Sequence, residues 1–386
     1  MSLVGALVLI WQGVPMNFHP YTVVTSVEGG QQIIAQGPVA ALEFIKNLGA
    51  NGGGFFGANG AHPFENPTPL TNLFEGLAIV LLPAALTNTF GRMIRQPRQG
   101  WMLYGVMVCI FVTGLIGLHL TEAERSHHLA ASTSLPLSES GGNMEGKETR
   151  FGVAGSALTA AVTSNGATGS INAAVDSFTP IGGLIVVTNM LLGEVAFGGL
   201  GTGLVGLLMA VLLAVFLAGL MVGHTPQYVG KRIGPSELKL IILYALVMPL
   251  AVLPLGAIAL TTSGGLAGLV TNHGPHGLTT ILVTYASSFA NNGLSFGGLA
   301  ANSPFYNVTT AMAMMAGRFG LVVPALALTG RFARQGVWPV TRGTLRTDSL
   351  TFGVLLIVSL VILAALSFAP ALVLGPILEH LAFFRA

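Results

Sequence analysis

The chain has 386 residues, of which 52% are hydrophobic and only 8% are charged. A soluble domain carries about 25% charged residues, so the composition excludes an ordinary soluble protein and predicts an all-α, polytopic membrane protein. The net charge of +2 and the lack of a basic stripe argue against binding to nucleic acid. The single cysteine, Cys109, lies in an apolar run, where we expect a small buried residue and neither a disulfide nor a metal ligand.

The chain begins with an apolar run, Leu3–Trp11, which is shorter than the roughly 20 residues that a spanning helix needs. No basic segment precedes this run, so we expect the second half of a spanning helix and no signal peptide. After a polar loop, Val39–Leu48 would reach about halfway across a bilayer core of roughly 30 Å, because a helix rises 1.5 Å per residue. That is the length of a re-entrant pore helix. An apolar span follows at about 73–91.

Between the half-helix and this span lies the glycine-rich stretch Gly49–Phe56. Each glycine inside a helix costs about 1 kcal/mol relative to alanine, so the three glycines at 52–54 predict a loop. Irregular backbone at membrane depth occurs only where protein buries it or where it lines a water-filled cavity. Backbone carbonyls of such a loop can replace the hydration shell of a cation. The alternative is a patch for close helix packing.

The same order of elements occurs three times, as an internal repeat of span, outer loop, half-helix, Gly/Asn loop and span. The second round consists of a span at 101–120, a polar loop at 121–150, a half-helix at 151–162, the loop Thr163–Ser170, and an apolar stretch at 181–222 with a break at 198–203. The third round consists of a span at 238–262, the half-helix Leu278–Phe289, the loop Ser287–Gly293 and a span at 304–328. We therefore divide the chain into pore repeats at 1–91, 101–222 and 238–330, and a final helix and tail at 347–386.

Ten of the 16 lysine and arginine residues lie in the turns that follow each second span. They are Arg92, Arg95, Arg98, Lys231, Arg232, Lys239, Arg331, Arg334, Arg342 and Arg346. The positive-inside rule places these turns in the cytoplasm, so the half-helices enter from the outer side. Each half-helix would then point its partially negative C-terminal end at a central axis, which attracts cations.

Three groups of residues are candidates for a functional site. The predicted selectivity-filter residues are Asn51, Gly52, Gly53, Gly54, Thr168, Gly169, Asn291, Asn292 and Gly293. The glycines of the break, Gly198, Gly199, Gly201 and Gly203, would form an inner constriction, with a simple kink as the alternative. Ionisable residues at membrane depth are functional candidates; these are Asp176, Glu194 and Arg318, with a structural ion pair as the alternative.

Several stretches resemble the potassium-binding subunit of the Kdp-type potassium-transporting ATPase, and together they cover essentially the whole chain. They are Asn51–Asn72, Asn143–Gly152, Gly193–Gly199, Ala218–Arg232, Ala290–Gly293 and Ala301–Asn307. The resemblance implies a fold of the potassium transporter superfamily, in which four span–pore–span repeats form one channel-like unit. Three of the four repeats would be present here, the first of them being the family's second.

The resemblance also implies a function. The chain would be the potassium-binding and translocating subunit of a high-affinity, ATP-driven uptake complex in a bacterial or archaeal cytoplasmic (inner) membrane. It would select K⁺ from the extracytoplasmic side and pass it to a P-type ATPase subunit, with small accessory subunits completing the complex. Asp176, Glu194 and Arg318 would then serve the ion path or the coupling to the ATPase subunit. Membrane lipid would surround the chain, K⁺ would be its transported ligand, and no organic cofactor is implied. The partner would hydrolyse ATP, in keeping with the lack of a Walker-type loop in this sequence.

The sequence departs from the family pattern in two ways. The family carries a complete repeat before the position where this sequence starts, so we expect either a fragment or a separate chain that supplies this quarter. Ala50, Gly57 and Gly60 stand where the family has threonine, asparagine and serine, and the pair Asn165-Gly166 is unusual.

Two other functions are alternatives to this one. A Trk/Ktr-type potassium channel or secondary transporter has the same fold and would be separated by ATP dependence. An intramembrane enzyme would need a catalytic constellation such as paired aspartates, and only Asp176 lies in a suitable place.

Overall fold

The computed structural model describes residues 1–123, 142–223, 225–339 and 344–383. Within these residues, six helical segments are long and apolar enough to cross a membrane. They are α3 (Pro69–Met93), α4 (Pro97–Ala123), α8 (Thr202–Val222), α9 (Pro235–Thr261), α12 (Pro304–Arg334) and the C-terminal run that starts with α13 (Leu350–Leu372). The predicted polytopic, helical membrane protein is confirmed.

Shorter helices and strands precede, connect and follow these spans. The helices are α1 (Ser2–Trp11), α2 (Val39–Leu48), α6 (Gly152–Gly166), η1 (Val175–Ser177), α7 (Pro180–Leu191), α10 (Ser263–Leu266), α11 (Gly274–Ala290), η2 (Val373–Ile377) and α14 (Leu378–Phe383). The strands are β1 (Thr22–Thr25) paired with β2 (Gln31–Ile34), and β3 (Gln227–Tyr228) paired with β4 (Lys231–Arg232), both antiparallel. The half-helices expected from the sequence correspond to α2, α6 and α11.

The helix after each glycine-containing loop begins with the same cap. Thr68, Thr179 and Ser303 each precede a proline, and each side-chain oxygen accepts a hydrogen bond from the backbone N–H three residues on, at 3.2, 3.1 and 3.3 Å. Such residues satisfy the free N–H groups of a first helical turn, and proline suits the first helical position. Because this capping turn is polar, hydrophobicity alone places the start of the span at about residue 73, whereas α3 begins at Pro69.

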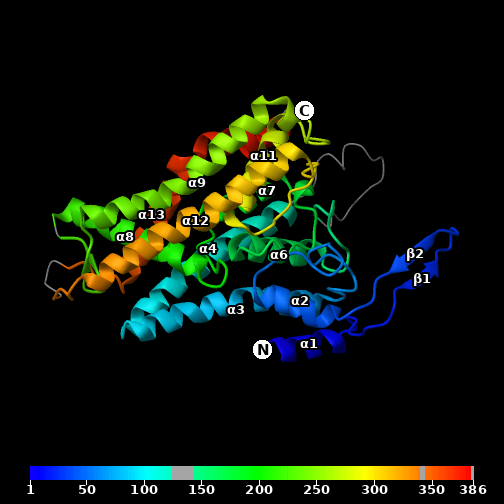
Figure 1. The fold of residues 1–386 in the computed structure, drawn as a ribbon, viewed down its shortest axis with the longest axis horizontal. Helices are drawn as coiled ribbons and strands as arrows, with labels where there is room; N and C mark the ends of the chain where they lie inside the picture. Colours follow the sequence, from blue (N-terminus) through cyan, green and yellow to red (C-terminus); the bar gives the residue numbers. More distant parts are fainter. Residues whose placement is uncertain (124–141, 224, 340–343, 384–386) are drawn as a thin grey trace.

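The three basic turns lie at one end of the bundle. Figure 1 shows the connections α3–α4, α8–α9 and α12–α13 at the left, while the hairpin β1–β2 projects from the opposite end. Arg342, which we counted in the third basic turn, lies outside the described residues. This arrangement agrees with a membrane orientation in which all three turns share one side.

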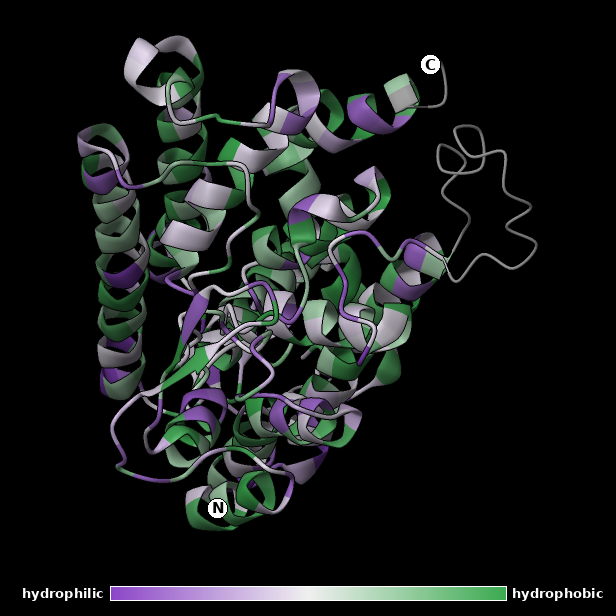
Figure 2. Cartoon of the chain, turned by 90° about the vertical axis from the view of Figure 1, so that its right-hand side faces the viewer, coloured by the Kyte–Doolittle hydropathy of each residue, from purple (hydrophilic) through white to green (hydrophobic). Residues whose placement is uncertain are grey.

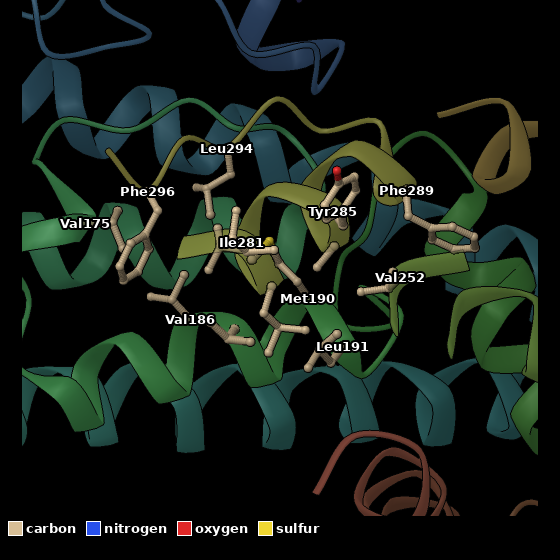
Figure 3. Close-up of a cluster of buried hydrophobic side chains, with 14 of the residues drawn as sticks. Val175, Val186, Met190, Leu191, Val252, Ile281, Tyr285, Phe289, Leu294 and Phe296 are labelled. Atoms are coloured by element: carbon tan, nitrogen blue, oxygen red, sulfur yellow. The ribbon is translucent and has the colours of Figure 1, made fainter. Parts of the chain in front are cut away.

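The half-helix α11 is held by an apolar core. Ile281, Tyr285 and Phe289 of α11 are at most 3% exposed, and they pack with Met190 and Leu191 of α7 (Figure 3). A second core joins α4, α8 and α13. Buried apolar packing of this kind fixes the position of the half-helix, and therefore of the loop at its end.

The outer faces of the spans are apolar and uncovered. Figure 2 shows the long helices mostly in green, whereas purple gathers in loops and at helix ends. Leu250, Val323 and Leu366 are 66%, 62% and 79% exposed, as expected where a side chain faces lipid. Cys109 is also exposed on α4. The expectation that it is buried was wrong, because it lies on the uncovered face of a span.

Two local features differ from the sequence analysis. The polar loop after α1 contains the hairpin β1–β2, in which Thr22 pairs with Ile34 and Thr25 with Gln31; its strands hold the valines, isoleucines and threonines that favour β structure. The break in the apolar stretch 181–222 is also longer than expected, because α7 ends at Leu191 and α8 begins at Thr202.

Candidate functional site

The three half-helices end in loops that share one backbone pattern. The first loop residue is a non-glycine residue with positive φ, and the glycine two positions later also has positive φ. The pairs are Ala50 (51°) and Gly52 (66°), Ala167 (56°) and Gly169 (72°), and Asn291 (59°) and Gly293 (75°). A non-glycine residue with positive φ is uncommon, and such residues cluster at functional sites. The equivalent dipeptides are therefore Asn51-Gly52, Thr168-Gly169 and Asn292-Gly293.

The three loops meet at their glycines. A Cβ atom built on Gly52 would lie 2.0 Å from the carbonyl oxygen of Thr168 and 3.2 Å from that of Asn292. A Cβ atom built on Gly169 would lie 2.1 Å from the same Asn292 oxygen. Only glycine allows this approach. The structure thus gathers the carbonyl oxygens of the second and third loops against the glycines of the first and second.

The next two glycines of the first loop face a different environment. The Gly53 N–H donates to Oδ1 of Asn59 at 2.8 Å, and the Gly53 carbonyl accepts from Nζ of Lys46 at 3.1 Å. A Cβ atom on Gly54 would lie 2.7 Å from Oε1 of Glu65. Gly53 and Gly54, which we predict in the filter, make these contacts with polar groups of the same repeat. Asn51, Gly53, Gly54 and Gly293 of the predicted set are exposed, whereas Thr168 and Asn292 are buried.

A buried charged cluster lies behind the first loop. Lys46 pairs with Glu43 at 2.5 Å and also donates to the Asn59 carbonyl. Glu65 accepts from the Phe56 N–H at 3.1 Å. Lys46 and Glu43 are 8% and 1% exposed. Our sequence analysis missed both, although a charged pair inside a ten-residue apolar half-helix is the signal that intramembrane ionisable groups give.

The second loop is shorter than the sequence suggested. Residues 163–166 belong to the last turn of α6, where Nδ2 of Asn165 donates to the Ala161 carbonyl at 2.9 Å. A Cβ atom on Gly166 would lie 2.8 Å from a methyl carbon of Ile79. The unusual Asn165-Gly166 pair is thus a helix end that packs against α3, and the loop itself starts at Ala167.

The loop between α7 and α8 packs against the ends of the half-helices. The Gly199 N–H donates to the Gly166 carbonyl at 3.1 Å, and Nδ2 of Asn292 donates to Oε1 of Glu194 at 2.5 Å. A Cβ atom on Gly198 would lie 1.8 Å from the Glu194 carbonyl oxygen. The glycines of the break therefore form a tightly folded loop and not a simple kink; Gly201 and Gly203 mark its junction with α8.

A cavity of about 400 Å³ lies beside this loop. Glu194 and Gly201 from the break, Asn291 from the third loop and Arg318 from α12 line it, among mostly apolar neighbours. With the residues that the structure describes, Arg318 makes no ion pair. Glu194 from the loop between α7 and α8 and Arg318 from α12 thus line the same cavity.

Asp176 lies apart from this cavity. It belongs to η1, and its Oδ1 contacts Nε2 of His276 at 2.9 Å and accepts from Nδ2 of Asn272 at 2.6 Å. His276 also reaches Oε1 of Glu379 with Nδ1, at 2.8 Å. The hydrogen bond to Glu379, assisted by that to Asp176, outweighs burial and raises the pKa of His276, which lies in the first turn of α11 outside the long helices. The three candidate charged residues therefore occupy two separate places.

The comparison with known families covers almost all of these elements. A family model described as "Potassium-transporting ATPase A subunit" matches residues 1–381. The chain belongs to this family. The resemblance predicted from the sequence motifs is confirmed, and the match favours the A subunit family over a Trk/Ktr-type transporter.

Curated relatives in the A subunit family carry the name "Potassium-transporting ATPase potassium-binding subunit". The protein of Solibacter usitatus is 49% identical over 380 residues, covering 98% of this chain and 66% of its own length. The protein of Rhodospirillum centenum is 49% identical over 382 residues, covering 99% and 66%. That of Paramagnetospirillum magneticum is 50% identical over 382 residues, covering 99% and 67%. The chain spans about two thirds of the length of the curated relatives that it matches.

Proposed function

We propose that this chain binds K⁺ and forms part of the translocation pathway of an ATP-driven potassium uptake complex. The observation that carries the proposal is the meeting of three loops with one backbone pattern, in which the Thr168 and Asn292 carbonyls approach Gly52 and Gly169. Carbonyl oxygens gathered in this way can replace the hydration shell of a cation. The C-terminal ends of the half-helices add partial negative charge.

We propose that K⁺ enters from the extracytoplasmic side, where Asp176 stands beside Gly297, shortly after the third filter loop. The ion loses its water at the filter and passes the Asn292–Glu194 hydrogen bond. It then reaches the cavity that Glu194 and Arg318 line. An oxygen of Glu194 can accept a cation there and the guanidinium of Arg318 opposes it, so the cavity would hold K⁺ only weakly and release it onward.

The names of the relatives support the proposed partners. A potassium-binding subunit of a potassium-transporting ATPase requires a second subunit that hydrolyses ATP, and we propose a P-type ATPase subunit that receives K⁺ from the cavity. Small accessory subunits and the cytoplasmic (inner) membrane complete the proposal. We propose that the chain comprises three pore repeats, at 1–91, 101–222 and 238–330, and a final helix and tail at 347–386.

Direct binding tests this function. The purified chain in lipid nanodiscs should bind K⁺ in isothermal titration calorimetry, and Na⁺ should bind at least about tenfold more weakly, as expected for a filter of carbonyl dipoles. Equal binding of the two ions, or no binding of K⁺, would contradict the proposal.

A further inference from the structure

We propose that Lys46 is a positioning residue of the filter: its ammonium group caps the Gly53 carbonyl and ends the row of carbonyls that the first loop offers to potassium. This inference rests on the proposed function. In this arrangement the Lys46 ammonium group marks the end of the cation site on the side of the first loop.

Both polar backbone groups of Gly53 are already used. Its N–H donates to Oδ1 of Asn59 at 2.8 Å, and its carbonyl accepts from Nζ of Lys46 at 3.1 Å. Lys46 also donates to the Asn59 carbonyl, so Lys46 and Asn59 together hold the backbone on both sides of Gly53. The Gly53 N–H lies in the peptide plane shared with Gly52, and its carbonyl lies in the plane shared with Gly54, so these bonds restrain the rotation of both planes. Gly52, one residue earlier, stays against Thr168 and Asn292.

The charge on Lys46 makes this cap selective against a second cation. A K⁺ ion on the Gly53 oxygen would share that oxygen with an ammonium group that is only 8% exposed. Two like charges that share one oxygen repel each other. Glu43, 1% exposed and 2.5 Å from Nζ, stabilises the ammonium in this setting. The Gly53 carbonyl is thus closed to potassium while the loop keeps its shape.

The other two loops lack such a cap. Each loop starts with a residue of positive φ, and we compare the residue four positions before it. This residue is Lys46 in the first repeat, Thr163 in the second and Ser287 in the third. Ser287 donates to Oδ1 of its own loop residue Asn292 at 2.7 Å. Only the first of these three positions therefore carries a charge.

The presence of Lys46 in the first repeat alone also explains the run of glycines in the first loop. The residue after the filter glycine is Gly53 in the first loop, with φ +76°, but Ser170 and Leu294 in the others, neither of which has a positive φ. The first loop therefore turns in a direction that its counterparts do not take. A positive φ is readily adopted by glycine, and here it directs the carbonyl back to Lys46. The second glycine of the run thus serves the cap and not the ion.

The test is a Lys46→Met variant of the full chain in nanodiscs, with K⁺ and Na⁺ binding measured by titration calorimetry. Loss of a charge-assisted hydrogen bond frees the Gly53 carbonyl, and we expect the ratio of K⁺ to Na⁺ affinity to fall about tenfold. The matched control is Lys147→Met. Lys147 is equally buried and pairs with Glu122 at 2.8 Å, but it does not contact a filter loop. Its variant should keep the ratio of the unsubstituted chain.

A ratio in Lys46→Met equal to that of the unsubstituted chain would overturn the inference while leaving the proposed function intact. An unsubstituted chain that binds no K⁺ would overturn both. If Lys46→Met yields no folded protein, the same titrations on an Asn59→Gly variant test the inference. Asn59 has φ 60°, which suits glycine, and this variant removes the acceptor of the Gly53 N–H. We expect a fall of about threefold in the ratio, and an unchanged ratio would contradict the cap.

Discussion

Asn292 donates a hydrogen bond from Nδ2 to Oε1 of Glu194 at 2.5 Å, and this bond connects the third glycine-containing loop to the loop between α7 and α8. The two residues are far apart in sequence, and both are buried. The Asn292 side chain also accepts from Ser287 Oγ and from the Leu294 N–H. One side chain thus joins the end of a half-helix, the loop that follows it and the interrupted span.

We expect Glu194→Ala to destabilise the chain by about 1–3 kcal/mol, because the buried Asn292 amide loses its acceptor. Glu194→Gln keeps an acceptor oxygen and should retain most of this stability. Thermal unfolding in detergent, followed by circular dichroism, measures the difference. Equal losses in the two variants would show that the charge of Glu194, and not the hydrogen bond, stabilises the loop.

Gly52→Ala should abolish K⁺ binding, because its Cβ atom would lie 2.0 Å from the Thr168 carbonyl oxygen. Gly53→Ala is the matched control. Both residues have positive φ, 66° and 76°, but a Cβ atom on Gly53 meets nothing within 4 Å. Gly53→Ala should therefore cost only about 1–2 kcal/mol of backbone strain. Titration with K⁺ compares the two, and similar affinities in both variants would contradict the close approach of the loops.

Stability should depend on pH through His276. Its bonds to Glu379 and Asp176 raise its pKa above the ordinary value of 6.5. The protonated form is therefore favoured in the folded state. Its contribution is complete below the pKa of the unfolded chain and is lost as pH rises through the higher folded pKa. Glu379 and Asp176 contact the two ring nitrogens of His276, and Asn272 donates to the same oxygen of Asp176.

The melting temperature of the unsubstituted chain should accordingly fall as pH rises above about 6.5. His276→Gln should flatten this part of the profile, since it keeps polarity but cannot ionise. An unchanged slope in His276→Gln would assign the pH dependence to other groups.

The helical, polytopic architecture was predictable from the sequence. Length alone identified Val39–Leu48 as a half-helix, and the structure forms α2 over the same residues. The run Gly52–Gly54, by contrast, could not be resolved from sequence. Its glycines look alike, and they are distinguished only by the Thr168 carbonyl on one side and by Lys46 and Glu65 on the other.

Long-range polar partners were also beyond the sequence. Asp176 and Arg318 were both recognised as unusual, yet Asp176 contacts His276 and Arg318 lines the cavity. Hydrogen bonds between distant segments depend on the packing of several helices at once, which periodicity does not encode. Lys46, by contrast, is recognisable as a functional candidate from the sequence alone, because it is a charged residue within an apolar half-helix.

The backbone hydrogen bond from Gly199 to Gly166 has a mechanical consequence. It fastens the loop between α7 and α8 to the C-terminal end of α6, directly before the second glycine-containing loop begins at Ala167. A movement of the loop between α7 and α8 therefore either breaks this bond or displaces the end of α6. The bond thus couples the interrupted span directly to the start of the loop at Ala167.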